Sequence, residues 1–88
     1  METFVVETYL SRHVEGEPEA TIARVEAAAR ATAAAGEAVR YLRSIFVPDD
    51  ESCLLIVEAH SVAAVERLLA RAGLASIRVA HAVTVEGG

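Results

Sequence analysis

The sequence has few of the residues that build the commoner kinds of chemical site. Its 88 residues include one cysteine, one methionine and no tryptophan. With Cys53 alone, the chain can form neither an internal disulfide nor a cysteine-based metal cluster. Because Cys53 lies in an apolar run, we expect it to be a buried, unreactive side chain. No spacing typical of Ser/His/Asp catalysis, a phosphate loop or a zinc-binding helix is present.

A surplus of basic residues and long apolar runs are also missing. The formal net charge is −5 and the eight basic residues, all arginines, are scattered, which argues against a nucleic-acid partner. No run approaches the roughly 18 apolar residues of a membrane span. The first residues enter a strand pattern without the basic and apolar segments of a signal peptide. We therefore predict a cytoplasmic protein, with one domain over residues 1–88, that binds neither nucleic acid nor membrane.

The apolar pattern predicts four strands and two helices. Residues 53–57 are all apolar, which is typical of a strand covered on both faces. Pro18 suits the first turn of one helix, and Ser61 is a good N-cap for another. Glycines at 36 and 73 are expected to end these helices. The expected strands cover residues 2–10, 39–47, 52–59 and 76–85, and the expected helices cover 18–35 and 62–72.

The order of these elements predicts an α+β, ferredoxin-like βαββαβ fold. Right-handed crossovers then give an antiparallel sheet of order 4-1-3-2 with both helices on one face. The other face stays bare, although apolar residues are expected on it. They are Val5, Ile45, Leu54 and Ile56, joined by Ile77 and Val79 of the fourth strand. An apolar face of this size predicts a homodimer in which one sheet packs on another.

Two stretches carry a resemblance to a known family. The segments FVVETYL (4–10) and SIFVPDDESCLLIVEAHSVAAVERLLARAGLASIRVAHAV (44–83) resemble a small bacterial family of uncharacterised domains that includes a nickel-binding protein. This family belongs to the dimeric α/β-barrel superfamily. The resemblance implies a ferredoxin-like dimer that binds a metal or small ligand. The matching residues are Glu7, Tyr41, Ser44, the step from Glu58 and Ala59 to Ser61, and the turn Ala72-Gly73-Leu74, whereas Arg43, Ile45, Leu55 and His60 depart from the usual pattern.

Polar residues expected on the bare face suggest a site. Carboxylates buried between two sheets must be paired, protonated or bound to a cation. One interpretation is a polar patch that fixes the register of the dimer. A second is a pocket for a small organic ligand, and a third is a divalent metal such as nickel. The candidate ligand-binding residues are Glu7, Tyr9, Tyr41, Arg43 and Glu58, and the candidate metal ligands are Glu7, Glu58 and His81.

These observations predict a homodimeric domain that binds a small ligand or a divalent metal. One alternative is a cofactor-independent monooxygenase or isomerase, which follows from superfamily analogy alone. Another is a structural or partner-binding module without a ligand. His13 and His60 are expected to be solvated loop residues, and the acidic run 49–51 to be a hairpin turn.

Overall fold

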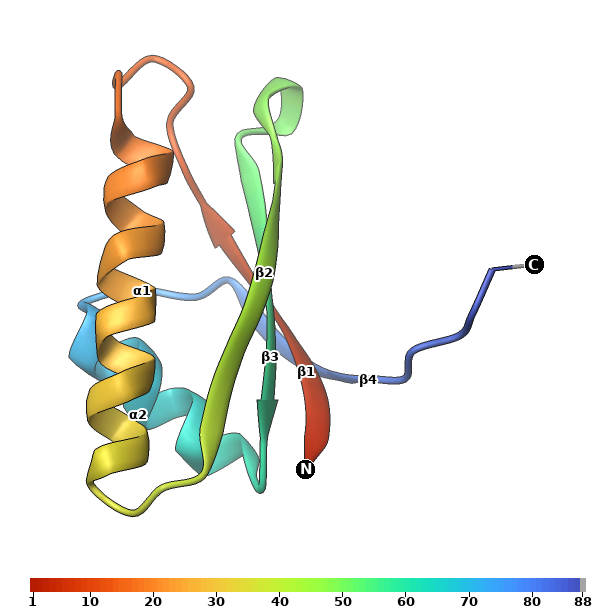
Figure 1. The fold of residues 1–88 in the computed structure, drawn as a ribbon. Helices are drawn as coiled ribbons and strands as arrows, with labels where there is room; N and C mark the ends of the chain where they lie inside the picture. Colours follow the sequence, from red (N-terminus) through yellow and green to blue (C-terminus); the bar gives the residue numbers. More distant parts are fainter. Residues whose placement is uncertain (88) are drawn as a thin grey trace.

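The computed structural model describes residues 1–87, which form a four-stranded antiparallel sheet with two helices packed together on one face (Figure 1). The strand order β2-β3-β1-β4 is the predicted order counted from the other edge. The α+β fold class is therefore confirmed. Among residues 1–87, no helix has the length and apolar character needed to cross a membrane. The strands are β1 Glu2–Tyr9, β2 Val39–Val47, β3 Ser52–Ala59 and β4 Arg78–Ala82, and the helices are α1 Glu17–Ala34 and α2 Val62–Ala72.

The boundaries of β2, β3 and α2 coincide with those predicted, whereas β4 is shorter. Its pairing with β1 ends where Ala82 lies opposite Thr3, close to the first residue of β1 at Glu2. Beyond Ala82 the neighbouring strand has almost no backbone left to pair with. The predicted strand over residues 76–85 therefore ends early.

The core lies between the sheet and the helices. Alternate residues of the two central strands are buried, and they include Val6 of β1 and Leu55 of β3, both fully buried. Val25 of α1 and Leu68 of α2 are equally buried on the other side of the core. Burying a side chain of this size stabilises the fold by about 1.5–3 kcal/mol.

Local signals set the ends of α2. The Ser61 hydroxyl accepts a hydrogen bond of 3.3 Å from the Ala64 backbone N–H, which satisfies a free donor of the first turn. At the other end Gly73 has φ 66°, and the Leu74 N–H donates to the Leu69 carbonyl. This left-handed turn needs the conformational freedom of glycine.

An irregularity in β2 changes which side chains face the helices. The pairing of β2 with β3 shifts between Tyr41 and Arg43, so that Leu42 is an extra residue. Tyr41 pairs with the buried Val57 and packs against the core. The expectation that Tyr41 shares a face with Arg43 is therefore wrong, because the bulge breaks the two-residue alternation of the strand.

The sheet surface away from the helices is called the open face. Its centre is apolar, since Val5 pairs with Ile56 across β1 and β3 and Leu54 is the next residue of β3 on this face. Val79, expected there, instead pairs with Val6 and packs against the core, while Ala80 takes the place beside Val5. The open face comprises Thr3, Val5, Glu7 and Tyr9 of β1, Arg40, Arg43, Ile45 and Val47 of β2, Ser52, Leu54, Ile56 and Glu58 of β3, and Arg78, Ala80 and Ala82 of β4.

Candidate functional site

Glu7 and Glu58 both lie on the open face, but they do not meet. Glu58 pairs with Thr3 of β1, and Thr3 and Glu7 are four residues apart. This spacing separates the two carboxylates by about 13 Å along the strands. Each has an arginine beside it instead. Arg40 lies 3.4 Å from Glu58, and Arg78 is the cross-strand partner of Glu7.

Arg43 lies midway along β2, whereas Tyr9 lies at the end of β1. Arg43 pairs with Ile56, two residues from Glu58, so these two side chains are diagonal neighbours. Tyr9 ends β1 and is 60% exposed. The five predicted ligand-binding residues therefore divide into Arg43 with Glu58, Glu7 and Tyr9 on their own, and Tyr41 on the other face.

His81 lies on the helix-facing side of β4. It pairs with Phe4, and the two rings contact edge to face with their centroids 5.7 Å apart. Its Nε2 atom is 3.4 Å from a carboxylate oxygen of Glu2. The placement of His81 beside Glu7 and Glu58 is therefore wrong. Within residues 1–87, no three His, Cys, Asp or Glu side chains are grouped so that they could hold a metal.

A groove of about 580 Å³ runs between α1 and β2. Two features of the sequence produce it. The facing side of α1 carries the small residues Ala29 and Ala33, and the bulge turns Tyr41 toward this helix. The Tyr41 hydroxyl is fixed by a hydrogen bond of 2.5 Å with the Ser44 hydroxyl. The groove is lined by Glu26, Ala29, Arg30, Ala33, Val39, Arg40, Tyr41 and Leu42.

The charges at the groove favour a ligand that carries an acidic group. Arg40 is engaged by Glu58 on the open face, whereas Arg30 forms no ion pair within residues 1–87. Glu26 precedes Arg30 by one helical turn and is the only acidic residue of the lining. Arg30 is therefore a cation available to a ligand beside an apolar surface.

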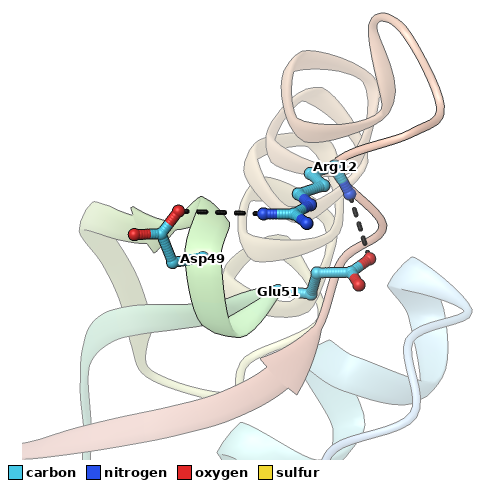
Figure 2. Close-up of polar contacts among 3 residues, drawn as sticks. All are labelled: Arg12, Asp49 and Glu51. Atoms are coloured by element: carbon cyan, nitrogen blue, oxygen red, sulfur yellow. Dashed lines mark hydrogen bonds and ion pairs between the residues drawn. The ribbon is translucent and has the colours of Figure 1, made fainter.

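A second polar cluster joins the loop after β1 to the turn between β2 and β3 (Figure 2). Figure 2 shows the Arg12 guanidinium facing Asp49 at 3.7 Å, while the Arg12 backbone N–H donates to the Glu51 carboxylate at 3.1 Å. The Arg12 hydrogen bond is the largest cause of a lowered pKa for Glu51. The contacts of Glu51 therefore stabilise the fold above its ordinary pKa of 4.5 and are lost as the pH falls through the lowered value.

Tyr9 belongs to the same cluster. A hydrogen bond to the Glu51 carboxylate, and the negative charge of that carboxylate, raise the pKa of Tyr9 above its ordinary 10.0. The interaction is present at neutral pH and is lost as the pH rises through this raised value. Tyr9 therefore lies near Glu51 at the edge of the open face.

We expect Glu51→Gln to return the pKa of Tyr9 toward 10.0, because the variant removes the charge that disfavours the phenolate. The ultraviolet absorbance of tyrosinate during an alkaline titration measures the pKa of Tyr9. Every protein compared also carries Tyr41→Phe, so that Tyr9 is the source of the signal. Asp50→Gln, at a neighbouring exposed acid, is the control. An unchanged titration in Glu51→Gln would contradict the assigned contact.

Cys53 is 1% exposed and lies in the core between sheet and helices. Burial raises the pKa of its thiol. A buried thiol with a raised pKa is a poor nucleophile at neutral pH. The prediction that Cys53 is buried is therefore confirmed.

Comparison with known proteins supports the fold and goes no further. The sequence matches no protein-family model and no curated protein. The structure is similar to that of SCO4226 from Streptomyces coelicolor A3(2), with a TM-score of 0.78 over 96% of this chain and 99% of that chain. The two sequences are 15% identical, so the similarity establishes a shared fold alone. Family membership and nickel binding, implied by the sequence resemblance, stay predictions.

Sequence reasoning did not find the groove. The alanine-rich face of the first helix was a signal, since small side chains leave space above a sheet unless larger residues opposite fill it. The other cause, the bulge at Leu42, shifts the strand register without a glycine or proline to mark it.

Proposed function

We propose that this chain is a homodimeric domain that binds a small organic ligand in the groove between α1 and β2. The observation that supports the proposal is the groove itself. Its volume of about 580 Å³ lies within the 300–1,000 Å³ typical of small-molecule sites. Such sites combine an apolar lining with a few polar groups. Here the polar groups are the Tyr41 hydroxyl and the Arg30 guanidinium, beside the alanines of α1.

The lining favours a ligand with a flat apolar body and an acidic group. Ala29, Ala33 and Leu42 offer apolar contact, and the Tyr41 ring adds an aromatic surface. When the Ser44 hydroxyl donates to the Tyr41 oxygen, the Tyr41 O–H is left to donate to the ligand. Arg30 would pair with a carboxylate or sulfonate, to which a guanidinium can donate two hydrogen bonds.

The homodimer is supported by the open face. Val5, Leu54 and Ile56 form an apolar centre on the side of the sheet that no helix covers. Around it lie Glu7 and Glu58 together with three arginines, at residues 40, 43 and 78. A two-fold axis lets such a surface meet itself, with apolar centre on apolar centre and charges of opposite sign at the rim.

Filling the groove tests the ligand site. We expect Ala33→Leu to weaken binding of the fluorescent probe 8-anilinonaphthalene-1-sulfonate about tenfold, because the larger side chain occupies space in the groove. This probe has the proposed chemistry, an aromatic body with one acidic group, and its fluorescence rises in an apolar site. Titration of the probe into each protein gives the dissociation constant.

Ala34→Leu is the matched control, because Ala34 is the next residue of α1 and does not line the groove. It should bind the probe as the parent protein does. Equal binding by parent, Ala33→Leu and Ala34→Leu would place the probe elsewhere and contradict the site.

A divalent metal such as nickel is the other ligand that the sequence resemblance implies. Since residues 1–87 of one chain group no three suitable side chains, a metal in this proposal would require ligands from two copies. Glu7 and Glu58, on the open face, would be brought near the partner by the proposed dimer. The groups with shifted pKa values, Tyr9, Glu51 and Cys53, lie outside the groove, so no observation favours catalysis there.

A further inference from the structure

The groove between α1 and β2 continues along α1 toward the N-terminal end of the helix. Beyond Glu26 lies a second hollow of about 420 Å³, here called the extension. It is lined by Pro18, Glu19, Ile22, Ala23 and Glu26, so it shares Glu26 with the groove. In Figure 1 the first turns of α1, drawn in orange, carry the extension.

Helical geometry places the extension and the groove on one side of α1. Positions three and four residues apart lie on the same face of a helix. Glu19, Ala23, Glu26, Arg30 and Ala33 follow one another at these spacings. The first three line the extension and the last three line the groove. The extension therefore continues the groove along a single face of the helix.

The extension is acidic, whereas the groove offers Arg30. Glu19 and Glu26 are the charged residues of its lining, and neither forms an ion pair within residues 1–87. Residues 14–23 include three glutamates and no basic residue. These carboxylates outweigh the partial positive charge, about half a unit, at the N-terminal end of a helix. Arg24, the next arginine along α1, lines a different hollow, beside α2.

Ile22 gives the extension an apolar base between the two carboxylates. It is partly buried and packs against the core. Glu19 precedes it by three residues and Glu26 follows it by four, so each carboxylate lies about one helical turn away. A cation above Ile22 is therefore within reach of both. This position is about 12 Å from Arg30 along the axis of α1.

We propose that the groove and its extension together bind one elongated molecule with an acidic group at one end and an ammonium group at the other. The acidic group pairs with Arg30, and the apolar body lies along Tyr41 and the alanines of α1. The ammonium group lies above Ile22, between Glu19 and Glu26. This inference depends on the ligand site proposed above, and adds the length of the ligand and its second charge.

Two rigid compounds test the inference. Biphenyl-4-carboxylate has an aromatic body and an acidic group, and 4′-(aminomethyl)biphenyl-4-carboxylate adds an ammonium group at the far end. Displacement of 8-anilinonaphthalene-1-sulfonate from the parent protein at low ionic strength gives both dissociation constants. We expect the compound with the ammonium group to bind about fivefold more tightly, because this group gains two carboxylate neighbours.

Glu19→Gln distinguishes the extension from the groove, because Glu19 lines only the extension. We expect this variant to reduce the advantage of the ammonium compound to about twofold, since one of the two carboxylates is lost. Glu66→Gln is the matched control, at an exposed acid of α2 that lines neither hollow. It makes the same change in net charge and should keep the fivefold advantage. Circular dichroism checks that both variants are folded.

The outcomes separate the extension from the groove. If biphenyl-4-carboxylate binds the parent protein more tightly than Ala33→Leu, the proposed ligand site stands. An ammonium compound without an advantage in the parent protein, or with the same advantage in Glu19→Gln, then overturns the role of the extension alone. If biphenyl-4-carboxylate binds the parent protein and Ala33→Leu equally, or binds neither, both proposals fail.

Discussion

We expect Val5→Asp to convert the proposed dimer into a folded monomer. Val5 lies at the centre of the open face, with Ile56 on one side and Ala80 on the other. An aspartate there would be buried between two apolar surfaces without a partner, and a buried unpaired charge costs several kcal/mol. Light scattering coupled to size-exclusion chromatography measures the change in mass directly.

The choice of Val5 follows from its neighbours. Ile56 is equally central, but Arg43 lies opposite it and could pair with an introduced aspartate. Ala63→Asp, on the exposed surface of α2, adds the same charge away from the open face and should stay dimeric. Circular dichroism checks that both variants are folded. A folded Val5→Asp that still elutes as a dimer would show that the open face is not the interface.

Leu55→Ala lowers the free energy of unfolding by about 3 kcal/mol. Leu55 is 0% exposed, lies on the central strand β3 and belongs to the core under both helices. Its truncation removes apolar burial and leaves a cavity that the rigid sheet cannot close. For a chain of 88 residues this loss is a large part of a total stability of about 5–15 kcal/mol.

Urea unfolding followed by circular dichroism measures this effect. Ile77→Ala is the control, since Ile77 is 64% exposed, and it should change stability by less than about 0.5 kcal/mol. Both variants are compared at one protein concentration, because the proposed dimerisation would add to the apparent stability. A Leu55→Ala protein as stable as the control would contradict the placement of the core.

The fold could be predicted from the sequence because its main signals are local. The apolar run 53–57 marked a central strand, and β3 indeed pairs with β1 on one side and β2 on the other. Ser61 and Gly73 marked the ends of α2, where the structure has a capping hydrogen bond and a left-handed turn. These signals depend on a few neighbouring residues, so they are the same for any register of the strands.

The candidate site could be predicted only in part, because it depends on register. Tyr41 faces the helices because β2 contains one extra residue. His81 faces the helices because the register of β4 against β1 pairs it with Phe4. A shift of one residue exchanges the two faces of a strand. Glu7 and Glu58 were correctly placed on the open face, but their distance depends on which residues pair, and the sequence pattern does not fix that.

Native mass spectrometry of protein purified without an affinity tag tests the central claim most directly. The proposed function predicts a dimer that retains a small organic molecule, up to one per chain, and loses it in Ala33→Leu but not in Ala34→Leu. A monomer, or a dimer that carries a stoichiometric metal ion and no organic molecule, would contradict it.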